Sequence, residues 1–174
     1  AVYSGFLGSE RQIGVVENFI CRFRGPDTVV VVDPVMGDYG RVYQTYTAAM
    51  CSGMARLAEL ADVITPNLTE AALLLGQPYE TLPAGEAGLR EITERLSLGG
   101  RRSVVLTGAS LAPGRTGAVC FDARTGKTEA VQTAYVAHEF HGTGDVFSSV
   151  LTGALVRETC LCGRAWILNP CWVC

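Results

Sequence analysis

Apolar residues follow two alternating patterns along this chain. Short runs rich in β-branched residues are typical of strands buried on both faces of a sheet, and they cover residues 27–35, 61–67 and 102–108. Longer segments with apolar residues at helical spacing cover residues 10–24, 45–60, 68–75 and 84–98. This order predicts an α/β fold with a mainly parallel central sheet flanked by helices on both faces.

The pattern changes after residue 116. Residues 117–121 and 127–136 are predicted to be two strands joined by a turn at residues 122–126, which makes a late β-hairpin. A last helix is predicted from about residue 144 to residue 157. No linker, repeat or low-complexity segment divides residues 1–157, so we expect them to form one domain.

Composition narrows the class of protein. The 174 residues are 48% hydrophobic and 18% charged with a net charge of −3, an ordinary globular profile. No basic stripe interleaves with aromatic residues, so we expect no nucleic-acid partner. No apolar run approaches the roughly 18 residues that span a bilayer, and the first residues do not resemble a signal peptide. We therefore expect a cytoplasmic protein without membrane contact.

The cysteines fall into two groups. Three lie in apolar contexts and are expected to be reduced thiols, namely Cys21, Cys51 and Cys120. Four crowd into residues 158–174, namely Cys160, Cys162, Cys171 and Cys174. The paired Cys-x-x-Cys spacing of structural zinc sites is absent. This favours an atypical Cys- and Trp-containing tail over a metal knuckle.

Polar residues follow each of the three buried strands. They are Asp33, then Thr65 with Asn67, then Thr107 with Gly108. In open parallel sheets, ligands bind outside the carboxyl ends of the strands. The sequence therefore predicts a binding site at this edge of the sheet.

The stretch "GTGD" directly precedes the last helix. Gly142, Thr143 and Gly144 would let backbone amides converge beside the positive end of the helix dipole, which suits a phosphate. Asp145 could then accept a proton from a hydroxyl that attacks the phosphorus. The alternative is that Asp145 caps the helix and the glycines only make a tight turn. These four residues alone support both interpretations equally.

Two further motifs have a structural and a functional interpretation. In "NLTE", Asn67 and Glu70 fit a capping box, which is favoured, but Glu70 could also order Mg²⁺ and its waters. In "DPVMGDYG", Asp33 and Asp38 would suit Mg²⁺ or a cationic ring nitrogen. Asp38 could equally be a solvated loop residue.

The remaining candidates are weaker. His138 and His141 are expected to have a structural or substrate-lining role, because no third metal ligand lies near them in the sequence. Tyr39, Tyr43 and Tyr46 are expected to pack or to form a lid. Neither GxxxxGK[ST] nor a nucleophile elbow occurs, which argues against a P-loop kinase and a hydrolase.

Five motifs in this order resemble the ribokinase-like superfamily and, within it, the pyridoxal kinases. They are "GFLGS", "VVDPVMGDYG", "DVITPNLTEAALLLG", "VVLTG" and "FHGTGDVFSSVLTGAL". The resemblance implies a ribokinase-like fold and Mg²⁺-dependent transfer of the ATP γ-phosphate to the 5′-hydroxymethyl of pyridoxal, pyridoxine or pyridoxamine. It leaves open whether a monovalent cation such as K⁺ is also needed. For the full-length family it implies a homodimer.

The resemblance assigns roles to the chemistry-bearing residues. Asp145 is the implied catalytic base and contacts the substrate hydroxyl, while Gly142, Thr143 and Gly144 form the anion hole. Phe6 matches an aromatic residue placed against the pyridine ring. Asp33 and Glu70 are the implied metal residues. The nucleotide is implied to contact Asp33, Thr65, Asn67, Thr107 and Gly108.

Two alternatives remain open. Hydroxymethylpyrimidine (phosphate) kinases belong to the same superfamily, but many of them carry cysteine where this chain has Asp145. A non-catalytic remnant that binds nucleotide weakly is the other alternative.

Two departures from the family pattern motivate the second alternative. The family's N-terminal segment has no counterpart in this sequence, and residues 158–174 replace the family's later helices. We therefore expect residues 1–157 to be a partial kinase domain. For the tail we hypothesise a shifted reading frame or a truncated gene product.

Overall fold

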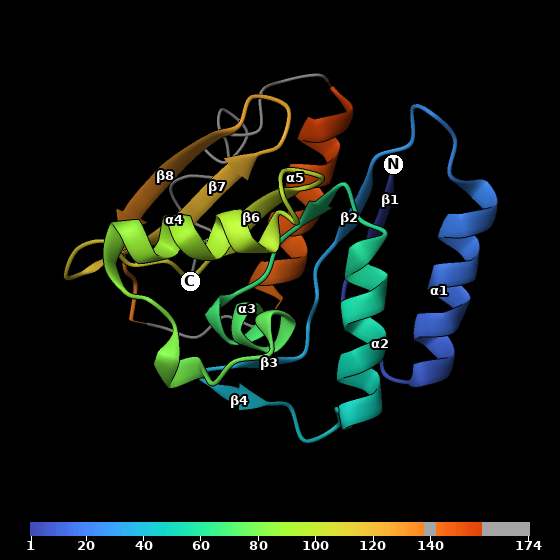
Figure 1. Cartoon of the computed structure of the whole chain (residues 1–174), viewed down its shortest axis with the longest axis horizontal. Helices are drawn as coiled ribbons and strands as arrows, with labels where there is room; N and C mark the ends of the chain where they lie inside the picture. The colour runs from blue at the N-terminus through green and yellow to red at the C-terminus, as the bar shows by residue number, and fades with distance from the viewer. Residues whose placement is uncertain (138–141, 158–174) are drawn as a thin grey trace.

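A six-stranded sheet forms the centre of the computed structural model, which describes residues 1–137 and 142–157 (Figure 1). In spatial order the strands are β1 (Val2–Ser4), β2 (Val30–Val32), β5 (Val63–Ile64), β6 (Ser103–Thr107), β7 (Arg115–Asp122) and β8 (Lys127–Ala134). The first four run parallel, and β7 and β8 form an antiparallel hairpin on β6. The predicted mainly parallel sheet with a late hairpin is confirmed. The tail 158–174, His138 and His141 lie outside the described residues.

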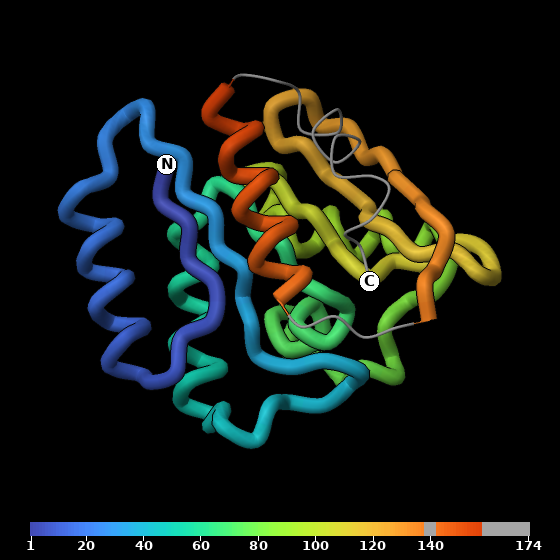
Figure 2. The backbone as a smooth tube through the Cα atoms, turned by 180° about the vertical axis from the view of Figure 1, so that it is seen from behind, coloured from blue at the N-terminus to red at the C-terminus, as the bar shows by residue number. Residues whose placement is uncertain are grey.

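Helices cover both faces of this sheet, as predicted, but unequally. One face carries α1 (Glu10–Phe23), α2 (Ala48–Glu59), α3 (Leu68–Leu75) and α4 (Gly85–Leu96). The opposite face carries α5 (Thr143–Val156), which lies in front of the sheet in the rear view of Figure 2. A short 3-10 turn, η1 (Tyr79–Thr81), links α3 to α4.

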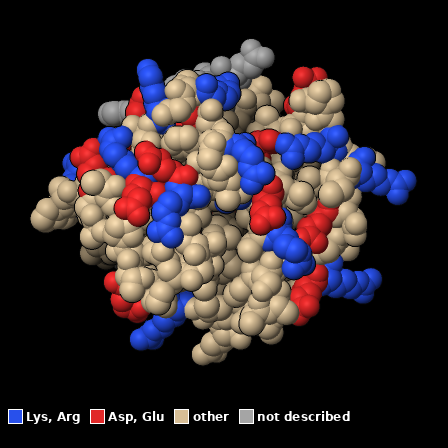
Figure 3. Space-filling view, viewed as in Figure 1, with Lys and Arg blue, Asp and Glu red and all other residues tan. Residues whose placement is uncertain are grey.

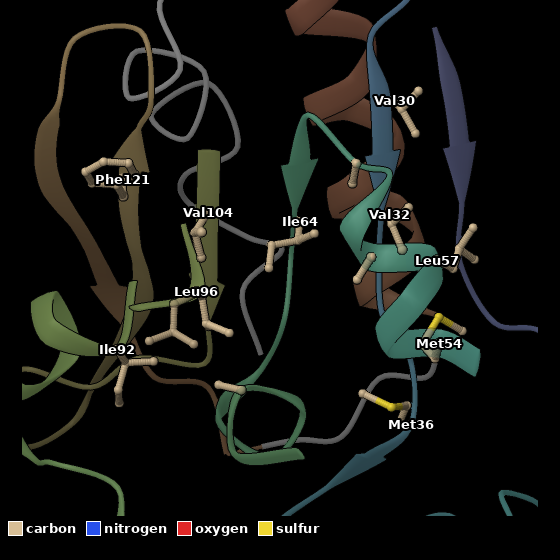
Figure 4. Packing of buried hydrophobic residues seen from close by; sticks show 14 of the residues in the cluster. Val30, Val32, Met36, Met54, Leu57, Ile64, Ile92, Leu96, Val104 and Phe121 are labelled. Atoms are coloured by element: carbon tan, nitrogen blue, oxygen red, sulfur yellow. The ribbon is translucent and has the colours of Figure 1, made fainter. Parts of the chain in front are cut away.

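The strand β2 shows why the apolar runs are continuous. Val30 and Val32 pack with α1–α4 in one cluster, part of which is drawn in Figure 4, whereas Val31 packs with α5 in the other. All three valines are fully buried. Because successive side chains of a strand point to opposite faces, a strand covered on both faces needs apolar residues at every position.

Most predicted elements are present, with shifted ends. The helix predicted at residues 45–60 begins at Ala48, because the Thr47 hydroxyl caps it by accepting the Met50 N–H at 3.1 Å. The run at residues 27–35 contributes only Val30–Val32 to the ladder. The first hairpin strand is longer than predicted and spans Arg115–Asp122.

Two short strands and the 3-10 turn η1 were not predicted. The "DPVMGDYG" segment, expected to be a loop, contains β3 (Gly37–Asp38), which pairs in antiparallel fashion with β4 (Arg41–Val42). Two-residue strands are too short to show an alternating pattern. This small hairpin lies at one end of the main sheet (Figure 1).

Surface and thiol properties of the described residues agree with a globular domain. Acidic and basic side chains are interspersed on the face shown in Figure 3. In the described part of the chain, no helix is both long and apolar enough to cross a bilayer. Cys21, Cys51 and Cys120 are free thiols, and Cys120 is buried.

Candidate functional site

A cavity of about 430 Å³ lies where the parallel strands end and α5 begins. In Figures 1 and 2, α5 begins on the side of the molecule where the β3–β4 hairpin lies. Every site residue predicted from the sequence lines this cavity: Phe6, Asp33, Thr65, Asn67, Glu70, Thr107, Gly108, Gly142, Thr143, Gly144 and Asp145. Segments from both ends of the described chain therefore meet in one place.

Backbone hydrogen bonds bring the strand-end residues to this edge. The Asp33 N–H donates to the Ser4 carbonyl at 2.8 Å, and the Thr65 N–H donates to the Val32 carbonyl at 3.2 Å. Each bond continues the parallel ladder by one residue beyond the strand. The polar side chains consequently leave the sheet on the same side as Thr107, the last residue of β6.

The "NLTE" motif forms the predicted capping box at the start of α3. The Asn67 side chain accepts the Glu70 N–H at 2.9 Å, and the Glu70 carboxylate accepts the Asn67 N–H at 2.9 Å. Both side chains also reach the "DPVMGDYG" segment. Glu70 accepts the Met36 N–H at 3.2 Å, and the Asn67 amide donates to the Gly37 carbonyl at 2.9 Å.

Thr69 adds a third contact of this kind, since its hydroxyl accepts the Gly40 N–H at 2.8 Å. The N-cap and first turn of α3 thus hold residues 36–40, which include β3, at three points. Asp38 lies in this hairpin, lines the cavity and accepts the Tyr39 N–H at 2.8 Å. The capping motif therefore shapes one wall of the cavity, which is a longer-range role than capping alone.

Two carboxylates in the cavity are buried. Asp33 is 6% exposed and Glu70 is 3% exposed. Burial, and secondly the nearby Asp145 carboxylate, raise the pKa of Asp33 to about 7, although hydrogen bonds to Thr65 and Ser148 oppose the rise. Burial and the charge of Asp33 likewise raise the pKa of Glu70 well above its usual range, against its backbone hydrogen bonds.

The "GTGD" turn has the geometry expected of an anion-binding helix start. Gly142 has a φ of 83°, in the left-handed region that favours glycine, and α5 begins at the next residue. A Cβ on Gly144 would lie 3.5 Å from Asp33 Oδ2, so the turn passes directly beside Asp33. The positive end of the α5 dipole therefore faces the cavity and the buried carboxylate.

Asp145 lies in the first turn of α5 and is exposed. The alternative that it caps the helix is not what the structure shows, because Gly142 occupies the N-cap position. In the described part of the chain, the hydrogen bond to its side chain comes from the Tyr3 hydroxyl, which donates to Oδ1 at 3.1 Å. Its carboxylate is therefore available to a group in the cavity.

Two further residues of the site, Tyr3 and Ser148, were not predicted from the sequence. Ser148 is 1% exposed, and its hydroxyl lies 2.9 Å from the Thr65 hydroxyl. Its position one helical turn after Asp145 is a signal that could have identified it. Tyr3 could have been found from strand alternation, which places it on the face that α5 covers.

Aromatic side chains form part of the cavity lining. Phe6 is 53% exposed, and its ring centroid lies 6.0 Å from that of Tyr46. Tyr46 is buried in the core, as the packing interpretation predicted, and its hydroxyl donates to the Leu7 carbonyl. Tyr39 and Tyr43 line the cavity instead. Two further lining tyrosines, Tyr79 and Tyr135, were not predicted from the sequence.

The charged side chains in the described cavity lining are all acidic. The described lining contains four carboxylates and neither lysine nor arginine; the carboxylates are Asp33, Asp38, Glu70 and Asp145. Within residues 1–137 and 142–157, no three ligating side chains converge as a complete metal site. An anionic ligand in this cavity would need a cation to accompany it.

The fold and the site together define an α/β protein with a ligand cavity at the carboxyl ends of its parallel strands. The sequence profile of the phosphomethylpyrimidine kinase family matches residues 1–162, and the chain belongs to this family. The pyridoxal kinase PdxY of Deinococcus radiodurans is 32% identical over 161 residues. That match covers 90% of this chain and 54% of the relative, so the chain spans about half the length of such relatives.

Solved structures show the same similarity. A candidate phosphomethylpyrimidine kinase from Bacteroides thetaiotaomicron, solved with pyridoxal, is 38% identical with a TM-score of 0.86, covering 94% of this chain and 57% of that one. For a pyridoxal kinase from Lactobacillus plantarum the values are 30%, 0.81, 96% and 58%. For a Leishmania donovani pyridoxal kinase with ADP and pyridoxamine they are 25%, 0.77, 94% and 56%. The predicted resemblance and fold class are confirmed.

Proposed function

We propose that this chain carries the catalytic residues of an ATP-dependent kinase of vitamin B6 salvage. Its reaction would phosphorylate the 5′-hydroxymethyl of pyridoxal, pyridoxine or pyridoxamine; pyridoxal would give pyridoxal 5′-phosphate. One observation carries the proposal: Asp145, at the amino end of α5, shares a cavity with the buried Asp33 and the exposed ring of Phe6. Similarity to structures solved with pyridoxal, or with ADP and pyridoxamine, supports the same substrates here.

Asp145 acts as the base in this mechanism. It accepts the proton of the substrate hydroxyl while the hydroxyl oxygen forms a bond to the γ-phosphorus and the bond to the leaving ADP breaks. The first-turn amides of α5, following the Gly142–Gly144 turn, stabilise negative charge on the transferred group. The proposal needs no covalent intermediate on the protein.

The donor set fits a hard divalent cation such as Mg²⁺. Asp33 and Glu70 are buried carboxylates whose pKa values are raised by desolvation and by nearby negative charge. A bound cation would stabilise their ionised forms, because it supplies the missing positive charge. Asp33 would bind the ion. Glu70 would add negative charge near the ion from a fixed position, since its oxygens already accept two backbone N–H groups. Bound Mg²⁺ would neutralise phosphate charge in a cavity whose described lining has no basic side chain.

The other lining residues divide between nucleotide and acceptor. Thr65, Asn67, Thr107 and Gly108 follow β5 and β6 and are proposed to contact the nucleotide. Phe6 follows β1 and is proposed to stack on the acceptor's aromatic ring. A monovalent cation, a homodimer and a cytoplasmic location stay predictions.

The family name itself supports a second candidate, phosphorylation of hydroxymethylpyrimidine or its phosphate. Asp145 is the feature that argues against it, because many kinases of that type carry cysteine there. A non-catalytic nucleotide binder is the third candidate. The cavity geometry is compatible with each, so the acceptor must be tested directly.

The test is ADP release by the 174-residue chain with Mg-ATP, offering pyridoxal and hydroxymethylpyrimidine in parallel. We expect turnover with pyridoxal. Turnover with the pyrimidine alone would establish the second candidate instead. No ADP release with either acceptor, together with measurable Mg-ATP binding, would establish the third candidate, a non-catalytic nucleotide binder.

Asp145→Asn separates catalysis from binding. We expect kcat to fall by roughly 10²- to 10⁴-fold, because the variant keeps the shape of the side chain and loses the base. Mg-ATP affinity, measured by calorimetry, should be retained. Asp27→Asn is the matched control, since Asp27 is exposed and does not line the cavity. An Asp145→Asn rate equal to that of the control would remove Asp145 from the mechanism.

A further inference from the structure

A tyrosine from the first strand contacts the proposed base. Tyr3 lies on β1, on the sheet face covered by α5, and its hydroxyl donates to Asp145 Oδ1 at 3.1 Å. The two residues are 142 positions apart in the sequence. The contact therefore joins the first strand of the described chain to its last helix.

Toward Asp145, the Tyr3 hydroxyl acts as the donor. Burial, followed by the charges of Asp33 and Asp145, raises the pKa of Tyr3 above its usual range, so the phenol stays protonated at neutral pH. Asp145 is exposed at the start of a helix, where an unrestrained carboxylate would sample several rotamers. A hydrogen bond to Oδ1 holds the carboxylate in one orientation and leaves Oδ2 for the substrate hydroxyl.

Gly5 leaves the space in which this contact forms. A Cβ on Gly5 would lie 2.8 Å from Asp145 Oδ1 and 2.8 Å from the Tyr3 hydroxyl oxygen. Gly5 does not have a positive φ, so an alanine would be accepted by the backbone and would collide only with these two side chains. This position constrains the contact through volume rather than through conformation.

We propose that Tyr3 and Gly5 are positioning residues for the Asp145 carboxylate. Tyr3 orients the carboxylate by donating to Oδ1, and Gly5 keeps the approach between the two side chains open. The proposal deepens the proposed function and rests on it for the role of Asp145. General bases act within hydrogen-bond reach of the proton that they accept, so their orientation controls the rate.

The first experiment measures orientation without turnover. Hα–Hβ couplings of Asp145, measured by NMR, report how many χ1 rotamers its side chain populates. We expect one rotamer in the parent chain and averaged couplings in Tyr3→Phe and in Gly5→Ala. Tyr46→Phe is the control, because it removes a hydroxyl that donates to the Leu7 carbonyl at 2.9 Å and does not touch Asp145. Identical Asp145 couplings in the parent, Tyr3→Phe and Gly5→Ala would overturn the proposal.

The second experiment is steady-state kinetics with Mg-ATP and pyridoxal. We expect Tyr3→Phe and Gly5→Ala to lower kcat about 10- to 100-fold, with the KM of both substrates unchanged. A purely structural role would instead lower stability and leave the kcat of the folded protein as it was, which would also overturn the proposal. If the parent chain has no turnover, the proposed function fails, and the couplings still decide whether Tyr3 and Gly5 orient Asp145.

Discussion

Asp33 combines deep burial with a negative neighbour, and this makes its protonation a determinant of stability. Its pKa is raised from 3.8 to about 7 in the folded protein. Between these values the unfolded chain releases the proton while the folded chain keeps it, so stability falls as the pH rises through this range. Above about pH 7 the loss is complete and constant.

Asp33→Asn should remove this dependence. The parent should lose stability between about pH 5 and pH 8, whereas the variant should not lose it, because the substituted amide cannot ionise. The difference in the free energy of unfolding, variant minus parent, should therefore increase by roughly 3 kcal/mol over this range. The measurement is urea denaturation of both chains at pH values across this range, without divalent cations. A difference between the two chains that stays constant with pH would contradict the raised pKa.

The helix α3 shows how one element can have both a local and a long-range role. Asn67 caps the helix through the Glu70 N–H, and the same side chain donates to Gly37 in the β3–β4 hairpin. Since Asp38 in this hairpin lines the cavity, the cap also supports the site. Loss of the cap should therefore affect both stability and binding.

Asn67→Ala should lower the free energy of unfolding by about 1–2 kcal/mol and weaken Mg-ATP binding. The control is Thr47→Ala, which removes the α2 cap to the Met50 N–H and leaves the hairpin contacts in place. Urea denaturation should show similar losses for both variants, whereas calorimetry should show weakened binding for Asn67→Ala alone. Because Asn67 is also proposed to contact the nucleotide, equal Mg-ATP affinities in the two variants would argue against both its hairpin contact and its nucleotide contact.

At the scale of the whole molecule, the cavity collects residues from segments that follow β1 and β2 and from α3, β6 and α5. A ligand that bridges these segments binds the folded state alone and stabilises the entire domain. Mass action predicts about 2.7 kcal/mol at a ligand concentration of roughly 100 Kd. The described lining of the cavity has carboxylates and lacks lysine and arginine, so this gain should require a cation.

Thermal unfolding checks this cation requirement. Mg-ATP should raise Tm by several degrees, in line with a few kcal/mol for a domain of this size. ATP with EDTA should raise it little, because the carboxylates repel the phosphates. Mg²⁺ with ADP tests whether the γ-phosphate matters, and we expect a smaller rise. An equal rise for ATP with EDTA and for Mg-ATP would exclude a role for the cation in binding.

Much of the element order could be predicted from local patterns. A run of four valines at residues 29–32 predicts a doubly covered strand whatever the rest of the chain does, and Val30, Val31 and Val32 are fully buried in the structure. The capping box joins residues three positions apart, so its signature is complete within one motif. Strand ends were predicted less well, because the ladder stops where a neighbouring strand stops.

The amino-acid sequence by itself determined the α/β class, the helices, the glycine turn and the strand-end polar residues, because each depends on neighbours within a few positions. Tertiary structure alone decided that Tyr3 meets Asp145, that Ser148 meets Thr65, and that the β3–β4 hairpin is held by α3. These contacts join segments far apart in the sequence. Their geometry follows from the packing of α3 and α5 on opposite faces of one sheet, which no local pattern specifies.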